Sequence, residues 1–301
     1  MKRREFLKAS AIGTLGINLL PWVNHHKLSA QEAFPQVVWV ENGEPEELLD
    51  AALRELGGMT RFVSKGDVVV VKPNIGWAKK PEFAANTNPD LVGAIVKECY
   101  AAGAKEVKVF DNTCNAWNRC YQYSGIEAAA KQYGGKVTQT YNHRYKNVRI
   151  NGQAINEWSL YQDYLEADKI INVPIAKHHS LDRVTLGLKN LMGIMGGNRG
   201  SLHNNFGQKL ADINMKLLPT LTIIDAYRIL VANGPTGGNL ADVRDKKTLI
   251  ASTCTVSADV TALKLFGHSM EQVQHIRVAA ERGMNKFDLN DLQVKTIRLT
   301  S

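Results

Sequence analysis

The chain has 301 residues, of which 44% are hydrophobic, 22% charged and 7% aromatic. This length and composition exclude a disordered chain and suffice for a sizeable core in one large domain or two smaller ones. The net charge of +8 overstates the charge of the folded part, since five of 37 basic residues and one of 29 acidic residues lie in the first 30 positions. The remainder, at +4 and without a basic stripe interleaved with aromatic residues, excludes a broad nucleic-acid-binding surface.

The first thirty residues carry the pattern of an export signal. Arg3 and Arg4 precede Phe6 and Leu7 in MKRREFLKAS, an apolar stretch AIGTLGINLLPWV follows, and small residues come next in KLSAQEA. The pattern resembles a twin-arginine signal, with cleavage expected near Ala30; a basic amphipathic first helix is the alternative. The apolar stretch is too short for a membrane-spanning helix, which needs about 20 residues. We therefore expect a periplasmic protein exported by the twin-arginine route, with no stable membrane span after signal removal.

Residues 35–301 are predicted to form a single α/β domain, because short Val- and Ile-rich strands alternate with helices. In chain order we expect a strand at 36–42, a helix at 45–58, a strand at 66–76, a helix at 87–104, a strand at 105–113, a helix at 123–135, and strands at 136–142 and 166–179; residues 221–230 and 247–267 add two strands and a helix. This alternation predicts a mainly parallel sheet with helices on both faces. A more polar segment leaves open a sub-domain boundary near residues 150–165.

Polar residues gather where the predicted strands end. They are Lys72, Asn74, Asp111, Asn112, Lys177, His179 and Asp225. A single Asp or Asn at such a place is more often a helix cap, so the repetition carries the argument. Because ligands of open parallel sheets bind beyond the carboxyl ends of the strands, we expect a site at this edge.

The segment from 172 to 200, NVPIAKHHSLDRVTLGLKNLMGIMGGNRG, holds the densest set of candidates. His178 and His179 are adjacent on an extended backbone and point in opposite directions, so at most one faces a site. Lys177 beside His179 suits an anionic ligand. If the following residues are helical, Thr185 and Lys189 share one face.

A glycine run follows, with Gly193, Gly196, Gly197 and Gly200 around Arg199. Its backbone N–H groups are suited to a phosphate or carboxylate, although neither nucleotide-binding fingerprint is met; a flexible loop or lid is the alternative. His203 stands just beyond the run, in a segment whose plainer interpretation is a capped surface helix.

The four cysteines are Cys99, Cys114, Cys120 and Cys254. No C-x-x-C pair is present, so the spacing supports neither an iron–sulfur cluster nor a zinc ribbon. Cys114 and Cys120 lie six positions apart in an expected loop, and the sequence leaves open whether they form a disulfide.

Several of these segments together resemble the domain of unknown function 362 family. They are VVVVKPNIGW, TNPDLVGAIV, GAKEVKVFDN, IINVPIAKHHSLDRVTLGLKNLMGIMG, LADINMKLLPTLTIIDAYRIL and SADVTALKLFG. The resemblance implies an α/β fold and export by a twin-arginine signal. The iron–sulfur clusters described for many members belong to an appended ferredoxin-like cysteine domain, which this chain lacks as a short form. His179 matches the histidine of the family's Lys-x-His pattern, and Gly207 stands where relatives often carry another histidine.

Two function classes remain open. The first is a periplasmic enzyme or cofactor-handling protein acting on an anionic small molecule, in which Lys177 and Lys189 hold negative charge and His179 carries a proton or binds a metal. Further ligand-binding candidates are Lys72, Asn74, Asn190, Gly196, Gly197 and Arg199, and the candidate ligands of a metal ion are Asp111, His179, His203 and Asp225. The alternative is a non-catalytic accessory or maturation factor for an exported redox partner, with the glycine run and a second glycine loop at 233–239 as docking surface.

Overall fold

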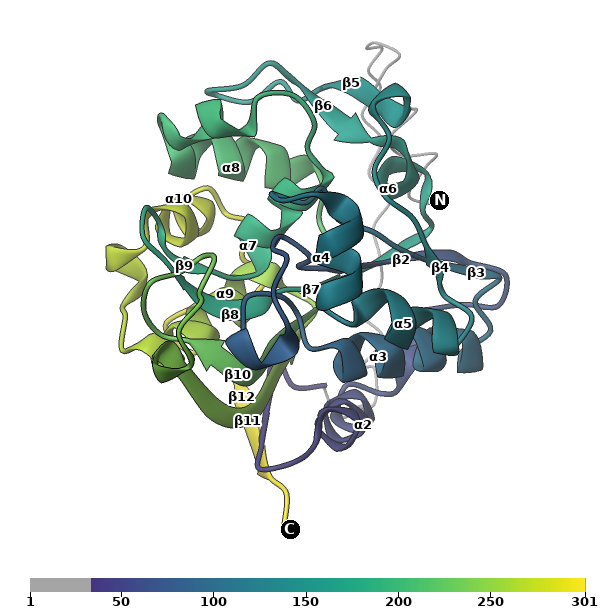
Figure 1. The fold of residues 1–301 in the computed structure, drawn as a ribbon. Helices are drawn as coiled ribbons and strands as arrows, with labels where there is room; N and C mark the ends of the chain where they lie inside the picture. The colour runs from purple at the N-terminus through teal and green to yellow at the C-terminus, as the bar shows by residue number, and fades with distance from the viewer. Residues whose placement is uncertain (1–33, 301) are drawn as a thin grey trace, which may run out of the picture.

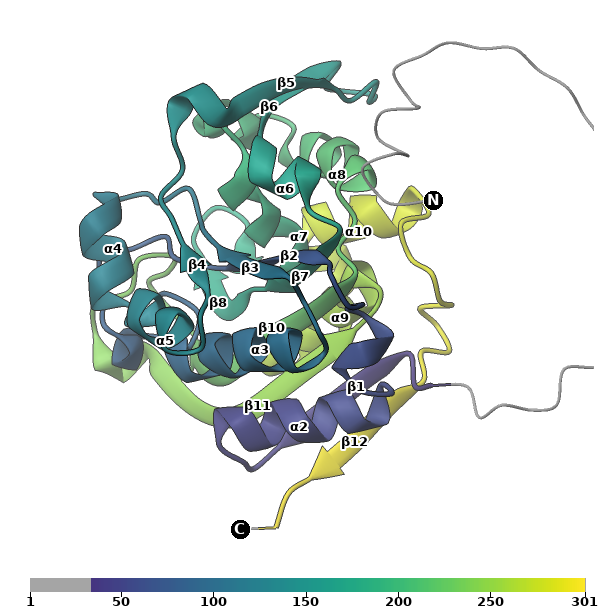
Figure 2. The same ribbon diagram turned by 90° about the vertical axis from the view of Figure 1, so that its right-hand side faces the viewer.

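The computed structural model describes residues 34–300. These residues form a ten-stranded, mostly parallel sheet with helices packed on both of its faces (Figures 1 and 2). The α/β fold expected from the sequence is therefore confirmed. The export signal expected at residues 1–30 lies outside the described residues.

The order of strands along the sheet is β12-β1-β11-β10-β7-β2-β3-β4, with β8 beside β10 and β9 beside β8. The strands are β1 (Val37–Glu41), β2 (Val68–Pro73), β3 (Glu106–Val109), β4 (Lys136–Val137), β7 (Lys169–Val173), β8 (Ile175–His179), β9 (Arg183–Thr185), β10 (Leu221–Leu230), β11 (Val243–Ser252) and β12 (Val294–Arg298). From β10 through β7, β2 and β3 to β4 every pairing is parallel, whereas β11 is antiparallel to both neighbours.

Nine α-helices surround the sheet within residues 34–300. They are α2 (Pro45–Glu55), α3 (Pro89–Ala101), α4 (Trp117–Tyr123), α5 (Ile126–Gln132), α6 (Gln162–Glu166), α7 (Gly187–Asn190), α8 (Phe206–Lys216), α9 (Thr255–Ala262) and α10 (Gln274–Glu281). Short 3₁₀ turns lie between them, of which η4 (Leu191–Ile194) and η5 (Arg199–His203) border the site described below, and η7 (Leu263–Phe266) borders a second hollow. None of the helices among these residues is long and apolar enough to cross a bilayer.

The period-two alternation of β2 decides which side chains face the site. Val69 and Val71 belong to the cluster that packs against α2 and α3, whereas Val70 belongs to the cluster on the opposite face, under α7 and α8. Lys72 is two positions from Val70, so it points toward α7. A fully buried lysine thus enters the α7 side of the sheet at the end of the strand.

The strand expected at 166–179 is two strands, because Pro174 has no N–H for the sheet and its carbonyl accepts the N–H of Asp225. β7 pairs with β2 and β10, and β8 then runs beside β10 and turns back as β9. The break carries Lys177 and His179 beyond the end of β2, alongside the last residues of β10. The sequence pattern also misses α4, which lies within a segment expected to be loop.

The segment with the open sub-domain boundary forms a hairpin of β5 (Tyr145–Arg149) and β6 (Glu157–Tyr161), followed by α6. Ile150, Ile155 and Leu160 belong to the same buried cluster as the apolar residues of α8. The hairpin therefore packs against α8 through a shared apolar core.

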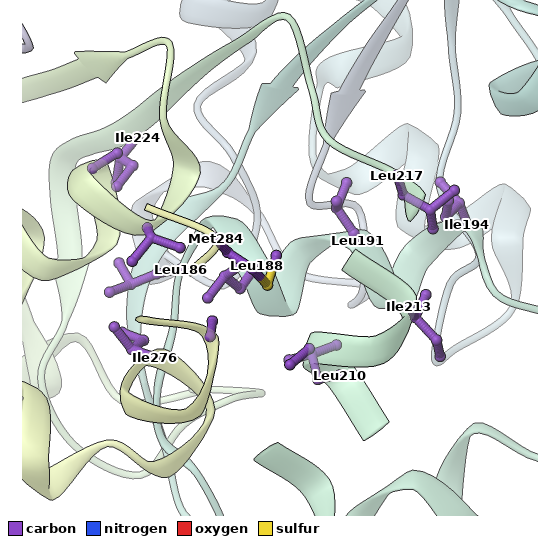
Figure 3. Close-up of a cluster of buried hydrophobic side chains, with 14 of the residues drawn as sticks. Leu186, Leu188, Leu191, Ile194, Leu210, Ile213, Leu217, Ile224, Ile276 and Met284 are labelled. Carbon is purple, nitrogen blue, oxygen red and sulfur yellow. The ribbon is translucent and has the colours of Figure 1, made fainter. Parts of the chain in front are cut away.

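α7 has only four residues, so its position depends on packing and on capping. Leu186, Leu188 and Leu191 insert into a cluster with residues of α8 and α10 (Figure 3), each buried leucine contributing about 2 kcal/mol. The carboxylate of Asp259 in α9 accepts the N–H groups of Gly187 and Leu188 at 2.7 and 2.9 Å, where α7 begins. These contacts fix α7 with its two polar residues turned toward the strand ends.

Candidate functional site

A pocket of about 600 Å³ lies beyond the ends of β2, β3 and β8, beside α7. Nine of the twelve candidate catalytic, ligand-binding and metal-binding residues line it: Asn74, Asp111, Lys177, His179, Lys189, Asn190, Gly197, Arg199 and His203. The strand ends and the glycine run thus meet in one place. Three candidates do not line it, namely Lys72, Gly196 and Asp225.

Lys72 lies beneath the pocket and contacts two residues that line it, Asp111 and Asn190. Its ammonium is 3.0 Å from Oδ1 of Asp111, whose Oδ2 accepts the N–H of Ile75 at 2.6 Å. Asn190 donates to the carbonyl of Lys72 at 3.0 Å and to Oδ1 of Asn172 at 2.9 Å. Burial lowers the pKa of Lys72, and Asp111 opposes this shift. The network fixes Asp111 and Asn190 at the pocket wall.

Gly193 is required by the closeness of this ion pair. A Cβ at this position would lie 1.7 Å from Oδ1 of Asp111 and 2.6 Å from Nζ of Lys72. Its carbonyl accepts the N–H of Asn112 at 2.8 Å, which joins the turn to the end of β3. The start of the glycine run is therefore a tightly packed wall, and the lid interpretation does not apply to Gly193.

Lys177 is a buried lysine that has no carboxylate partner in the described part of the chain. Its ammonium donates to Oδ1 of Asn74 at 3.2 Å and to the carbonyl of Ala85 at 2.6 Å. Among residues 34–300, no carboxylate lies within 4.0 Å of it. Burial lowers its pKa to about 7; Cys114 and Asp111 oppose this shift, whereas the charges of Lys189 and Lys72 act in the same direction as burial. The side chain therefore exchanges between amine and ammonium near neutral pH.

Asp182 connects three basic side chains on the opposite wall. Its Oδ2 forms a short ion pair with Lys189 and lies 3.4 Å from Nδ1 of His179 and 3.7 Å from Nδ1 of His203. The ammonium of Lys189 also lies 4.2 Å from the ring centroid of Phe206, a cation–π contact. Burial lowers the pKa of Lys189, opposed by Asp182.

His179 is held as a neutral ring. Its Nδ1 accepts the N–H groups of Leu181 and Asp182 at 3.3 and 3.4 Å, so the proton of the neutral ring resides on Nε2. Burial, together with the charges of Lys189 and Lys177, lowers its pKa to about 2. His179 is therefore suited to donate a hydrogen bond from Nε2, and the expected role as proton carrier is disfavoured.

The ring of His203 stacks on this histidine. The ring centroids of His179 and His203 are 6.2 Å apart with an interplanar angle of 26°, and His203 stacks in turn on Phe206 at 5.2 Å. Burial, and then the charge of Lys189, lower the pKa of His203, and Asp182 opposes this shift. The two imidazoles thus line the pocket as neutral, parallel rings.

Arg199 and Thr185 complete the polar lining. Arg199 donates to the carbonyls of Asn112 and Thr113 at 2.8 and 3.2 Å, and no carboxylate within residues 34–300 lies within 4.0 Å of it. Thr185 pairs with Lys177 across β8 and β9 and faces the same pocket. It lies on a strand, so the helical face it was expected to share with Lys189 does not exist. Its buried hydroxyl has no hydrogen-bond partner within the described residues.

Asp225 does not reach the pocket. β10 continues five residues beyond it to Leu230, and Asp225 lies where this strand changes its partner from β7 to β8. Its carboxylate accepts the N–H groups of Asn88 and Tyr227 at 2.7 and 3.0 Å, and burial raises its pKa to about 6. Asp225 is a backbone cap at the start of α3. Its expected place among metal ligands at the pocket is wrong, because its carboxylate does not line the pocket.

Gly196 also lies outside the lining. Its N–H donates to the carbonyl of Ser159 at 2.8 Å, and a Cβ would lie 2.7 Å from the ring of Tyr145. Gly196 therefore joins the glycine run to the β5–β6 hairpin, and its N–H group is not free for an anion.

The four expected metal ligands do not converge. Asp111 pairs with Lys72, Asp225 caps α3, and only the two histidines lie close together. Among residues 34–300, no group of three or more His, Cys, Asp or Glu side chains is placed to hold a metal ion.

All four cysteines carry free thiols. Cys99, Cys120 and Cys254 are buried, whereas Cys114 is exposed and lines the pocket. Cys120 instead directs its sulfur toward the carbonyl of Gly76 at 3.6 Å, so the disulfide left open by the sequence is not formed.

Asp182 and Asp259 were not among the residues expected from the sequence. Asp182 stands three residues after His179 in HHSLDR, and an antiparallel pair of strands around a tight turn brings these two residues together. Recognising the turn would have been enough to find it. Asp259 lies 72 residues from the N–H group of Gly187, and no local pattern connects the two.

Residues 69–264 match the family model described as Domain of unknown function (DUF362). The chain belongs to the DUF362 family. The matched segment contains every pocket residue discussed above. The DUF362 chain is 27% identical over 250 residues to Thylakoid-associated protein sll1697 of Synechocystis sp. (strain ATCC 27184 / PCC 6803 / Kazusa), covering 80% of this chain and 74% of that protein.

Among solved structures, the DUF362 chain is similar to the lactate racemase apoprotein from Thermoanaerobacterium thermosaccharolyticum. The TM-score is 0.48 at 12% sequence identity, and the match covers 80% of this chain. The chain spans 58% of the length of that racemase structure.

Proposed function

We propose that this DUF362 protein binds an anionic small molecule in the pocket between the strand ends and α7, and that Lys177 exchanges a proton with it. The charge balance of the pocket supports the proposal. Lys72 and Lys189 each have a carboxylate partner, whereas Lys177 and Arg199 have none within 4.0 Å among the described residues. A bound anion would supply the missing negative charge.

The observation that carries the proposal is the environment of Lys177. A buried ammonium that meets only neutral oxygen atoms is disfavoured, and here burial lowers the pKa to about 7. Such a pKa is suited to general acid–base chemistry at neutral pH, because both protonation states are populated. An anion beside Nζ would raise this pKa, so binding would be accompanied by proton uptake.

The surrounding residues suit the same ligand. His179 offers the N–H of its neutral ring, and the unpaired hydroxyl of Thr185 offers a further hydrogen bond. Arg199, held by two backbone carbonyls, presents a guanidinium in a fixed orientation. The ligand would thus meet one cation that changes its protonation state and one that keeps its charge.

The proposal includes export by the twin-arginine route to the periplasm, on the strength of the first thirty residues. A resident metal ion is a separate matter that elemental analysis of the purified protein decides. Stoichiometric metal that is lost in His179→Ala would make His179 a metal ligand in place of a hydrogen-bond donor.

Titration calorimetry with sulfate, oxalate and succinate at pH 7 tests the proposed function. We expect at least one of these anions to bind, with affinity at least about tenfold weaker in Lys177→Met, since a charge-assisted hydrogen bond is lost. Lys131→Met removes an exposed lysine of α5 and is the matched control with unchanged affinity. Equal binding by Lys177→Met and the wild type would overturn the proposal. A protein that binds none of these anions would favour the accessory-factor alternative.

A further inference from the structure

A second hollow lies on the other side of the β8–β9 turn. Its volume is about 570 Å³, and it lies between this turn, the end of β10, and η7 with the residues that follow it. The two pockets share His179, Ser180 and Leu181, so the turn forms the partition between them. Leu181, at the tip of the turn, is 70% exposed. None of the roles described so far uses the second hollow.

Its lining is basic. Arg183, His178 and His268 contribute the ionisable side chains besides His179, and no Asp or Glu is among the lining residues. Within residues 34–300, no carboxylate lies within 4.0 Å of any of these three side chains. The first pocket, by contrast, contains Asp111. An anion would therefore meet hydrogen-bond donors on several sides of the second hollow and the positive charge of Arg183.

The two histidine donors are also held in place. Nδ1 of His178 accepts the N–H of Gly234 at 3.1 Å, which leaves the proton of the neutral ring on Nε2. The ring of His268 lies nearly parallel to that of Phe266, with centroids 6.3 Å apart and an interplanar angle of 14°. Arg183 has φ of +64°, a left-handed backbone that side chains other than glycine adopt at a cost.

We propose that the second hollow receives another anionic group of the same ligand. The ligand of the proposed function is then an elongated molecule with an anionic group at each end. One end meets Lys177 and Arg199, and the other meets Arg183, His178 and His268, on opposite sides of the turn. This inference rests on the proposed function for the first end only, because the second hollow is built from different side chains.

Linear alkane disulfonates of increasing length test this arrangement, because a sulfonate stays ionised at every pH used. Calorimetry of the full exported chain should find two sulfates bound per chain, but a single disulfonate. At the matching length, the disulfonate should bind at least about tenfold more tightly than the monosulfonate of the same length, because its second group binds intramolecularly. Arg183→Gln combined with His268→Gln should remove one sulfate and abolish the preference for the disulfonate.

The control is His143→Gln combined with Arg149→Gln, an exposed pair with the same loss of charge near the β5–β6 hairpin. It should retain both sulfates and the preference for the disulfonate. Two sulfates and an intact preference in the Arg183/His268 variant would overturn the second subsite. Two sulfates without a preference at any length would overturn the shared ligand. If Lys177→Met leaves the number and affinity of bound sulfates unchanged while the Arg183/His268 variant loses one sulfate, the proposed function fails and the second subsite stands.

Discussion

The ammonium of Lys177 lies 3.2 Å from the amide oxygen of Asn74, where a lysine buried this deeply ordinarily meets a carboxylate. Lys72, one strand away and equally buried, shows the ordinary arrangement, with Asp111 at 3.0 Å. The difference between the two lysines separates a structural ion pair from a group that is free to respond to a ligand.

Gly193→Ala should destabilise the protein by about 3 kcal/mol or more. The added Cβ would overlap Oδ1 of Asp111 and force the buried ion pair with Lys72 apart. Urea unfolding followed by circular dichroism measures the change. Gly200→Ala in η5 is the control, since its Cβ would approach only the flexible side chain of Asn198, at 3.2 Å. A loss as small as that of the control would mean that the floor of the pocket is not packed as described.

Asp182→Asn should lower the free energy of unfolding by about 3 kcal/mol, because the buried ammonium of Lys189 loses its counter-ion. The double variant Asp182→Asn/Lys189→Met should lose less stability than the two single variants lose together. The difference, which is the coupling energy, should be about 2 kcal/mol. The exposed pair Glu127 and Lys131, changed in the same way, should couple by less than about 0.5 kcal/mol. Additive losses at Asp182 and Lys189 would contradict the ion pair.

One thiol per native chain should react with Ellman's reagent, and all four should react after unfolding. Cys114 is exposed at the pocket, whereas the other three cysteines are buried and none forms a disulfide. A ligand that fills the pocket should slow the reaction of the native protein. A native chain without a reactive thiol, and with only two after unfolding, would show that Cys114 and Cys120 are joined in the mature protein.

Arg3→Lys combined with Arg4→Lys should retain the protein in the cytoplasm at its unprocessed length, because the twin-arginine receptor reads the guanidinium pair. Cell fractionation and mass measurement follow the outcome. Lys2→Arg combined with Lys8→Arg keeps the charge and the pair, and should be exported like the wild type. Normal export of the Arg3/Arg4 variant would rule out this route.

The sequence predicts most strands of the sheet, because the continuous apolar run of β2 and the alternation around it are local properties, but it predicts neither β9 nor β12. It also brings the correct strand ends together, since parallel strands end at one edge of a sheet. Lys177 and His179 were found in this way. What the local pattern cannot supply is the protonation state of His179, which depends on burial and on Lys189, a residue from the neighbouring helix.

Asp225 was expected at the end of a strand but does not lie there. Its sequence context resembles that of a strand end, yet β10 continues because its later residues find a different partner in β8. Asp182 was missed because its importance arises from a hairpin that brings it beside His179 and from the helix that carries Lys189. In each case the deciding contact is tertiary, and no periodicity of a single segment encodes it.

The most direct test of the account is whether anion binding protonates Lys177. With a pKa of about 7 in the free protein, Lys177 is mostly neutral at pH 8, and only its ammonium form attracts an anion. Sulfate affinity should therefore fall by about tenfold for each pH unit above 7, since sulfate itself does not titrate there. Calorimetry at pH 8 in buffers of different ionisation enthalpy should reveal uptake of nearly one proton per bound sulfate at the first pocket, and none in Lys177→Met. Sulfate binding without proton uptake, and with equal affinity from pH 6 to pH 9, would contradict the account.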